Sequence, residues 1–293
     1  MSTRVVDICE VGPRDGLQNE KRIVSVDDKL RFITLLARAG FREIEATSFV
    51  SPKWVPQLAD AEEVLPRAIA AHPATLFSVL VPNEKGLERA LACGARKVSV
   101  FTAASEGFAR KNINATIGES IVRFEPVVRR AHEVGVPVRG YVSCVVACPY
   151  DGAIAPSAVA DTCARLAAIG VDELDLGDTI GAGTPETIAH VLDECARVRP
   201  IDEIVLHLHD THGRAVDCAR RALELGVRRF DGSAAGIGGC PYAPGARGNV
   251  ATESLVDLCA SLGYSTSIDR TALGEAARFI TGVLAAPLPA GDG

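Results

Sequence analysis

The chain has 293 residues, 47% of them hydrophobic, which is enough to bury a large core in one barrel or two smaller domains. Its formal net charge of −6 argues against a surface for nucleic acid or an anionic membrane. The sequence has no run of about 18 apolar residues that would span a membrane and no apolar secretion signal, so we expect a cytoplasmic protein. The nine cysteines are scattered and odd in number, which predicts reduced thiols.

Strand and helix patterns alternate along the chain. Short apolar, β-branched runs occur at residues 5–9, 43–48, 76–81, 97–102, 138–145, 173–176, 204–209 and 228–233. Helical spacing occupies segments between them, such as 27–39, 117–133, 157–169, 185–198 and 214–225. Eight strands joined by helical crossovers predict a parallel sheet with right-handed connections, and the length suits one closed (β/α)8 TIM barrel.

The alternative architecture is an open, doubly wound sheet. Such a sheet usually has a Gly-rich phosphate turn after its first strand, whereas residues 11–18 form a polar, charged loop, and this favours the barrel. We expect one domain over residues 1–293, with the barrel over about 5–262, a helical extension over about 263–285 and a flexible tail at 286–293. Five helix-to-strand junctions carry a glycine placed for a left-handed helix cap: Gly40, Gly94, Gly135, Gly170 and Gly226.

The apolar run at 204–209 ends in a His-x-His step. Side chains alternate along a strand, so His207 and His209 point the same way. Two neutral imidazoles at this separation commonly hold a divalent cation. The alternative is two core histidines that are hydrogen-bonded separately, and the strand alone does not decide between the two interpretations.

In a TIM barrel the functional site lies at the carboxyl ends of the strands, so polar residues there are the candidates. They are Arg14, Asp15 and Gln18 after the first strand, Glu45 in the second, Lys111, Asn112 and Asn114 after the fourth, Tyr141 and Ser143 in the fifth, Asp178 and Thr179 at the sixth, His207, His209 and Asp210 at the seventh, and Asn249 after the eighth.

Asp15 is the candidate carboxylate to join the two histidines at a cation. With an Asn carbonyl or waters, this set of ligands suits Mg²⁺, Mn²⁺, Co²⁺ or Zn²⁺. The alternative for Asp15 is a turn cap, since its loop contains Gly12 and Gly16. Asp210 is a competing ligand, but it directly follows His209 and so points off the shared face, towards a cap on the next helix.

Seven segments of the chain resemble 3-hydroxy-3-methylglutaryl-CoA (HMG-CoA) lyases. They are residues 10–20 (EVGPRDGLQNE), 45–57 (EATSFVSPKWVPQ), 111–114 (KNIN), 139–144 (RGYVSC), 176–181 (LGDTIG), 207–210 (HLHD) and 238–243 (GGCPYA). The similarity extends from about residue 5 to residue 262, and the motifs are long enough to be specific. Other metal-dependent TIM barrels that act next to a carbonyl share only the shorter Arg-Asp-Gly and His-x-His elements.

The resemblance implies cleavage of HMG-CoA into acetyl-CoA and acetoacetate with Mg²⁺ or Mn²⁺. The metal ligands of the family match Asp15, His207, His209 and Asn249. In this retro-Claisen reaction the C3 hydroxyl loses a proton, the adjacent C–C bond breaks, and the electrons form an enolate on the thioester. The implied partners are an acyl-CoA substrate and further copies of the chain in a dimer or tetramer, with neither nucleic acid nor membrane.

The same resemblance implies roles for single residues. Arg14 would meet the thioester oxygen, with Glu45 as its ion-pair partner. Cys240 matches the loop cysteine of the family and would protonate the enolate. Asp178 and, if the metal does not hold it, His207 are candidates for the base, and Asp178 with a metal-held His207 is favoured. Weaker positional arguments assign substrate orientation to Gln18, Tyr141, Ser143 and Thr179, and CoA contacts to Arg110, Lys111, Asn112 and Asn114.

Three functions other than HMG-CoA cleavage are compatible with the predicted barrel and cation site. A lyase for a bulkier 3-hydroxy-3-alkylglutaryl-CoA in branched-chain or terpenoid catabolism stays open, because one pocket substitution changes discrimination by only about 1–3 kcal/mol. A condensing synthase is less favoured, since such enzymes commonly carry a further regulatory region, whereas we expect only a short tail after the barrel in this sequence. A non-catalytic metal-binding barrel would be expected to lose Arg14 or Cys240, and both are present. Leucine breakdown, ketone-body formation and terpenoid degradation stay open as the pathway.

Overall fold

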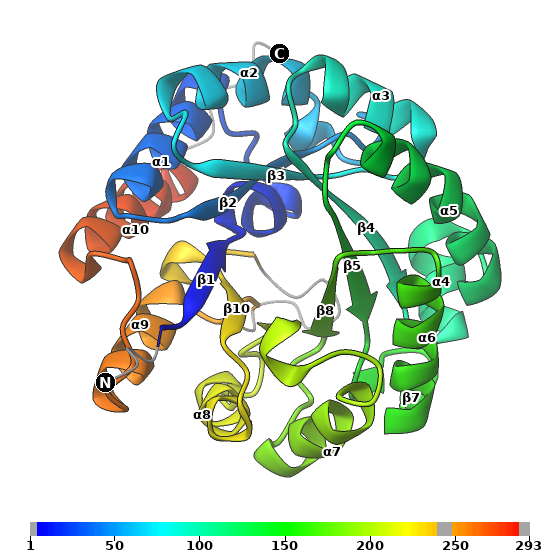
Figure 1. Cartoon of the computed structure of the whole chain (residues 1–293). Coiled ribbons are helices and arrows are strands. Elements are labelled where there is room, and N and C mark those ends of the chain that lie inside the picture. The colour runs from blue at the N-terminus through cyan, green and yellow to red at the C-terminus, as the bar shows by residue number, and fades with distance from the viewer. Residues whose placement is uncertain (1–4, 239–247, 287–293) are drawn as a thin grey trace.

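Eight parallel strands pair side by side until the last returns to the first. The computed structural model describes residues 5–238 and 248–286. Around the ring the strands follow the order β1-β10-β9-β8-β5-β4-β3-β2, and β1 pairs in parallel with β10 to close the sheet. Helices surround this closed sheet (Figure 1). The predicted (β/α)8 TIM barrel is therefore confirmed.

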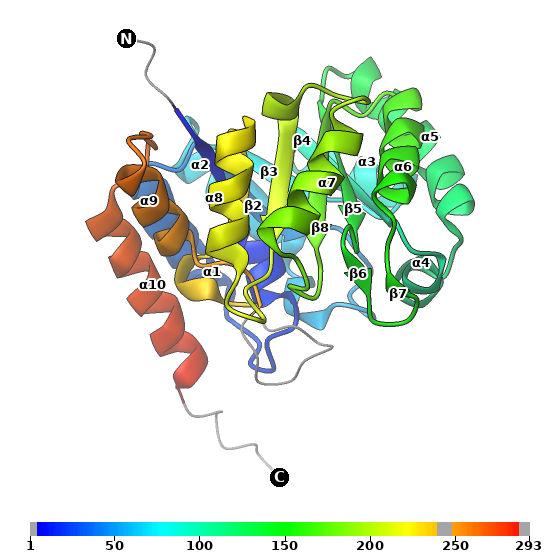
Figure 2. The same cartoon turned by 90° about the horizontal axis from the view of Figure 1, so that it is seen from below.

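All eight predicted runs form barrel strands, with end positions that shift by no more than two residues. The strands are β1 (Asp7–Glu10), β2 (Glu43–Ser48), β3 (Leu76–Leu80), β4 (Lys97–Ala103), β5 (Val138–Ser143), β8 (Glu173–Asp178), β9 (Ile204–Leu208) and β10 (Arg229–Gly232). His209 lies just beyond β9, where it forms an isolated bridge with Asn249. A short antiparallel hairpin of β6 (Ala147–Cys148) and β7 (Gly152–Ala153), not expected from the sequence, follows β5 and is seen below β5 and α6 in Figure 2.

The helices begin and end where local chemistry favours it. Ser25 and Asn83 accept the amide of the third helical residue at two helix starts, and Thr116 forms a capping box with Glu119 at a third. All five predicted cap glycines have positive φ, from +72° to +113°. The helices are α1 (Val26–Arg38), α2 (Ala61–Ala71), α3 (Glu84–Ala92), α4 (Glu106–Ile113), α5 (Ile117–Glu133), α6 (Pro156–Ala168), α7 (Pro185–Cys195), α8 (Ala215–Leu225), α9 (Thr252–Ser261) and α10 (Arg270–Ala285).

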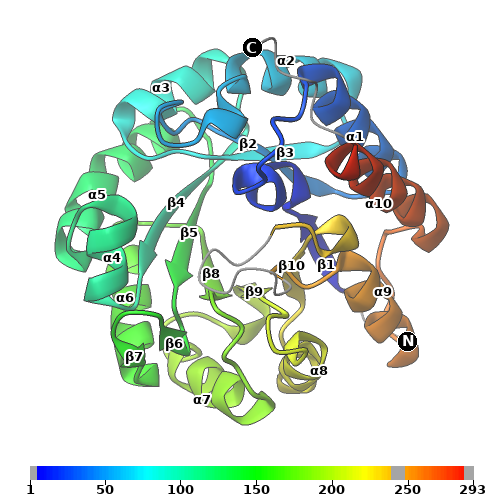
Figure 3. The same cartoon turned by 180° about the vertical axis from the view of Figure 1, so that it is seen from behind.

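The apolar core lies between the barrel and its ring of helices. Outward-facing strand residues such as Ile44, Val79, Val100, Leu174 and Leu206 are fully buried there. The helical ring that covers them is seen from the opposite side in Figure 3. None of the cysteines in the described part of the chain forms a disulfide, in agreement with the predicted thiols.

The inside of the barrel is polar. Arg139 on β5 contacts Glu43 on β2 at 3.1 Å and Asp231 on β10 at 3.1 Å, and neither strand is its neighbour in the sheet. These contacts therefore cross the barrel. TIM barrels usually fill this space with branched apolar side chains. Here a layer of paired charges, to which Lys97 and Glu173 also belong, lies below the mouth.

Two helices extend the chain beyond the eighth strand. α10 lies in the segment 263–285, the expected helical extension, whereas α9 lies before it. α10 docks on α1, where the Arg31 guanidinium lies 4.7 Å from the Phe279 ring centre. Residues 287–293, the greater part of the expected tail, lie outside the described residues. Of the residues described, no helix is long and apolar enough to span a membrane.

Candidate active site

A tight turn after β1 brings two candidate residues to the mouth. Residues Gly12–Gly16 form one π-helical turn, in which the amides of Arg14, Asp15 and Gly16 converge on the Val11 carbonyl at 2.8 to 3.2 Å. A Cβ on Gly12 would lie 2.5 Å from Glu10 Oε1, so a side chain there would collide with its neighbour. The expected polar loop is thus a compact turn that presents adjacent Arg14 and Asp15 to the same site.

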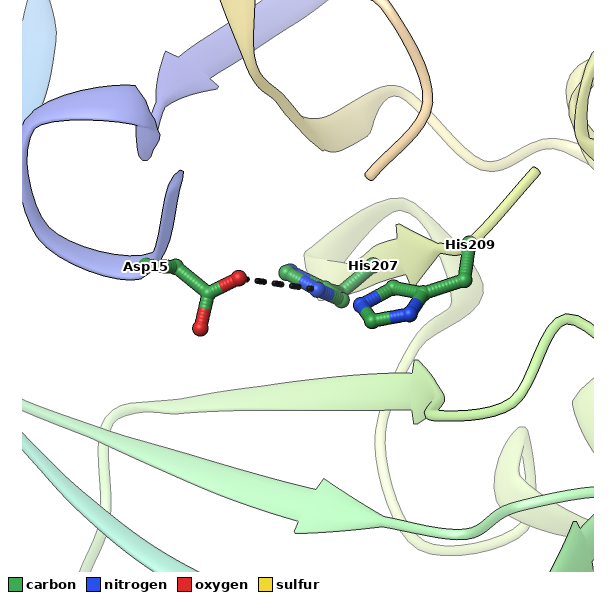
Figure 4. A group of neighbouring side chains, drawn as sticks. All are labelled: Asp15, His207 and His209. Atoms are coloured by element: carbon green, nitrogen blue, oxygen red, sulfur yellow. Dashed lines mark ion pairs between the residues drawn. The ribbon is translucent and has the colours of Figure 1, made fainter. Parts of the chain in front are cut away.

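Asp15 faces the two histidines of the His-x-His step (Figure 4). Its Oδ2 atom is 4.0 Å from His207 Nε2, and the ring centres of His207 and His209 are 5.3 Å apart. One potential ligand atom from each of the three residues lies within 4.8 Å of the others. Asn249 Nδ2 donates to Asp15 Oδ2 at 2.9 Å, so the structure brings all four predicted metal ligands together.

Two buried atoms of this group support a site for a cation. His209 Nδ1 and Asn249 Oδ1 have no hydrogen-bond partner among the described residues. A buried polar atom without a partner costs about 1–3 kcal/mol, so such atoms often have a ligand or water to satisfy them. Together with Asp15 and His207, they form a mixed oxygen and nitrogen set that fits a divalent cation. The group is a possible metal site.

The charges of Asp15 and His209 also suit a cation. Burial raises the pKa of Asp15, but the nearby Arg14 and the two histidines outweigh it and hold that pKa below its usual range. Burial and the neighbouring His207 lower the pKa of His209 to about 4. Burial lowers the pKa of His207 too, but its hydrogen bond to Asp231 and the charge of Asp15 raise it to about 9. Asp15 is therefore ionised and His209 neutral at neutral pH, as metal ligands must be, whereas His207 is protonated there and would have to lose a proton to act as a ligand.

Arg14 is held by carboxylates on two sides. Its Nε donates to Glu45 Oε2 at 2.6 Å and its Nη1 to Asp15 Oδ1 at 2.7 Å, and the guanidinium lies 5.5 Å from the Tyr141 ring centre. Arg14 is only 6% exposed and Glu45 is fully buried. The expected ion pair between Arg14 and Glu45 is present. A guanidinium has five N–H donors, so donors remain for a substrate oxygen.

The carboxylate of Asp178 has a different environment from the one expected of a base. Its oxygens accept the amides of Ala182 at 3.0 Å and Gly183 at 2.8 Å, in the turn that leads to α7. Strand alternation places Asp178 on the outer face of β8, opposite to Asp175. These contacts organise a loop, and the role of Asp178 as a base stays a prediction. Asp210 accepts the Ala215 amide at the start of α8, as its expected capping role requires.

The other candidates lie around or outside this cluster. Tyr141 is buried beneath Arg14, and Thr179 Oγ1 accepts the Cys144 amide at 2.8 Å. Lys111, Asn112 and Asn114 are exposed at the end of α4, whereas the cluster lies over β1 and β9; Gln18 and Ser143 are partly buried. Cys240 lies outside the described residues, so its role as the acid stays a prediction.

Three charged residues beneath the cluster were not anticipated. Arg139, Asp175 and Asp231 are buried, and Asp231 Oδ2 lies 3.1 Å from His207 Nδ1. Strand alternation could have placed Asp231 on the inner face. Its pairing with His207 depends on the register between β9 and β10, which the sequence does not reveal.

The fold and the site define a TIM-barrel protein with a possible cation site at the carboxyl ends of its strands. The HMGL-like family model matches residues 5–280, which is most of the chain. A hydroxymethylglutaryl-CoA lyase of Pseudomonas mevalonii is 52% identical over 272 residues, which cover 93% of this chain and 90% of the relative. The chain belongs to the HMGL-like family.

Solved structures agree with this family. The HMG-CoA lyase of Brucella melitensis superimposes with a TM-score of 0.93 at 50% identity, over 96% of this chain and 99% of that one. An HMG-CoA lyase of Acinetobacter baumannii in complex with coenzyme A and 3-methylmalate has a TM-score of 0.91 at 34% identity, over 99% and 94% of the two chains.

Proposed function

We propose that this protein is a metal-dependent lyase that cleaves HMG-CoA into acetyl-CoA and acetoacetate. Relatives that are about half identical over nearly the whole chain are named HMG-CoA lyases. The observation that carries the proposal is the position of Asp15, which contacts Arg14 at 2.7 Å through one oxygen and faces His207 with the other. A cation site and a fixed guanidinium thus lie on either side of one carboxylate.

The cation would be held by Asp15, His207, His209 and Asn249. When bound, it would supply Lewis-acid stabilisation of negative charge on substrate oxygens. We propose Mg²⁺ or Mn²⁺, because the carboxylate and amide oxygens suit these hard cations. The neutral state of His209 and the ionised state of Asp15 at neutral pH support the assignment.

The residues of the chain then have separate tasks in the reaction. A base takes the proton of the C3 hydroxyl, and this base is Asp178, or His207 if the cation does not hold its ring. The C2–C3 bond breaks, its electron pair passes to the thioester as an enolate, and the C3 oxygen becomes the ketone of acetoacetate. Arg14 donates N–H groups to the thioester oxygen as negative charge develops there, and Glu45 keeps the guanidinium in place. Cys240 gives a proton to C2 of the enolate, which releases acetyl-CoA.

Other residues would bind and orient the acyl-CoA. We assign the CoA moiety to the rim at Lys111, Asn112 and Asn114, because these polar side chains are exposed at the carboxyl end of the barrel. The family relative seen with coenzyme A supports a site for CoA on this fold. The acyl group would be oriented by Gln18, Tyr141, Ser143 and Thr179.

The substrate can be tested by acetoacetate release. Purified protein is stripped with a chelator, reloaded with Mg²⁺ or Mn²⁺, and given HMG-CoA or a homologue with a longer 3-alkyl group. We expect acetoacetate from HMG-CoA with the cation and at least about a hundredfold less without it. Cleavage of the longer homologue alone would refute the proposed substrate. Full turnover in the stripped protein would refute the need for a cation.

The proposal includes one catalytic domain per chain, a cytoplasmic location and a dimer or tetramer. Light scattering on the purified protein tests the oligomer, and a monomeric mass would contradict it. Fractionation of the native cells with an antibody tests the location.

A further inference from the structure

His207 and Asp231 occupy matched positions on adjacent strands. In the parallel pair of β9 and β10, Asp231 is the register partner of His207, and both side chains face into the barrel. Asp231 Oδ2 is 3.1 Å from His207 Nδ1, and Asp231 is only 1% exposed. This contact occupies Nδ1 and leaves Nε2 as the ring atom that faces Asp15, 4.0 Å away.

The carboxylate of Asp231 is itself held in place. Arg139 Nη1 donates to its Oδ1 at 3.1 Å, and the Tyr141 hydroxyl donates to its Oδ2 at 3.4 Å. Arg139 cannot easily turn away, since it also contacts Glu173 at 3.0 Å and Glu43 at 3.1 Å. A rigid series of contacts therefore extends from the charged layer of the barrel to the His207 ring.

The buried carboxylates of Asp175 and Asp231, next to His207, are already paired with the positive charge of Arg139. Ligand atoms of Asp175, Asp231 and His207 lie within 4.8 Å of one another, which is close enough for a second cation. However, the Arg139 guanidinium is 3.1 Å from Asp231 and 3.5 Å from Asp175. A further cation at this position would meet the guanidinium, so Asp231 is better suited to hold the His207 ring.

The two histidines of the cluster differ in this support. His209 Nδ1 has no hydrogen-bond partner among the described residues, whereas His207 Nδ1 has Asp231. Metal-binding histidines commonly donate their second ring nitrogen to a carboxylate, which fixes the tautomer and the ring plane. We propose that Asp231 is a positioning residue that keeps the proton of His207 on Nδ1 and directs Nε2 to the cation site. This inference rests on the cation site of the proposed function.

The first test measures Mn²⁺ affinity of the stripped protein, with free Mn²⁺ followed by electron paramagnetic resonance. Asp231→Asn keeps the size of the side chain, but its amide can donate as well as accept, so the tautomer is no longer fixed. We expect it to weaken Mn²⁺ binding about 10- to 100-fold. Glu43→Gln is the matched control, because it removes another carboxylate from Arg139 without a contact to His207. It should change the affinity less than about threefold.

The outcomes separate this inference from the proposed function. Failure of the wild-type protein to bind Mn²⁺ would remove the cation site itself, and with it both proposals. Wild-type affinity in Asp231→Asn, or an equal loss in Glu43→Gln, would overturn the positioning role alone and leave the lyase proposal intact.

A second measurement needs no variant of Asp231. In wild-type protein with ¹⁵N-labelled histidine and saturated with Mg²⁺, the His207 signals should show a protonated Nδ1 and an unprotonated Nε2. The resonances are assigned by their loss in His207→Asn. A proton on Nε2 in the wild-type protein would contradict the inference.

Discussion

At the scale of single residues, Asp15 links the two halves of the candidate site. Its Oδ1 accepts from Arg14, and its Oδ2 accepts from Asn249 and faces His207. A change at Arg14 therefore alters an ion pair of a metal ligand as well as the group proposed to bind the thioester oxygen. The effect on the metal ligand and the effect on the thioester oxygen can be told apart, because Asn249 still donates to Asp15 when the guanidinium is removed.

Arg14→Gln should lower kcat at least about a hundredfold, because it removes a charged donor from the oxygen where negative charge develops. Its Mn²⁺ affinity should stay within about threefold of the wild type, since all four proposed ligands remain. Arg42→Gln is the control, because Arg42 is exposed and its ion pair among the described residues is with exposed Asp7, at 3.2 Å. Steady-state kinetics and Mn²⁺ titration check both variants, and wild-type kcat in Arg14→Gln would contradict the role of Arg14.

The sequence predicts residues of the site when one strand or loop contains the information. Alternation puts His207 and His209 on one face, and the end of a barrel strand puts them at the mouth. The residues that support His207 are different, because Asp231 is 24 residues away from it along the chain and Arg139 is 92 residues away from Asp231. Those pairings depend on strand register and on closure of the barrel, which only the folded chain defines.

At the scale of elements, the turn after β1 controls where Arg14 and Asp15 lie. Glu10, at the end of β1, accepts the Gly12 amide at 3.0 Å, the Ala234 amide at 2.8 Å and the Thr252 hydroxyl at 2.8 Å. It thereby ties this turn to the start of α9. The sequence indicates a polar loop here, but one five-residue π-helical turn has no periodicity by which to recognise it. The β6–β7 hairpin is not predicted for the same reason, because its strands of two residues each are too short to show a periodicity.

Gly12→Ala tests this turn. The added Cβ would lie 2.5 Å from Glu10 Oε1, so either Glu10 loses its contacts or the turn moves. We expect the free energy of unfolding to fall by about 1–3 kcal/mol and kcat to fall as Arg14 and Asp15 are displaced.

Gly118→Ala is the control for this substitution, because the nearest atom to its added Cβ is 4.0 Å away, in the first turn of α5. It should be neutral or stabilise the protein by up to about 1 kcal/mol. Urea unfolding and kinetics measure both variants. Equal stability of Gly12→Ala and the wild type would show that the turn has room for a side chain.

At the scale of the whole molecule, the barrel has an apolar outer layer and a charged inner one. Alternation predicts the apolar outer faces, because they repeat along every strand. The inner faces of the strands contribute Glu43, Lys97, Arg139, Glu173 and Asp231, which would be costly to bury singly. They become tolerable only when the closed barrel brings opposite charges within 2.6 to 3.1 Å. Stability of the whole fold should therefore depend on the ionisation of this layer.

Glu173 makes that dependence measurable. Its carboxylate contacts Lys97 at 2.6 Å, Arg139 at 3.0 Å and Arg229 at 3.0 Å. Burial raises the pKa of Glu173, but the charges of Arg139 and Lys97 outweigh it and lower that pKa from 4.5 to about 2. Between these values the unfolded chain binds a proton that the folded chain does not, so stability rises with pH. The stabilisation that ionised Glu173 gives to the fold is fully present above about pH 4.5 and is lost as the pH falls to about 2.

Glu173→Gln should therefore be less stable than the wild type at pH 7, and the difference should stay constant down to about pH 4.5. Below that pH it should shrink, by as much as about 3 kcal/mol near pH 2, because the wild-type carboxylate becomes protonated and loses its advantage over the amide. Urea unfolding from pH 7 to pH 3 measures the difference. Glu125→Gln, at an exposed position on α5, is the control and should show no such change. A difference in stability that stays the same at pH 3 as at pH 7 would mean that the charged layer does not hold Glu173 ionised.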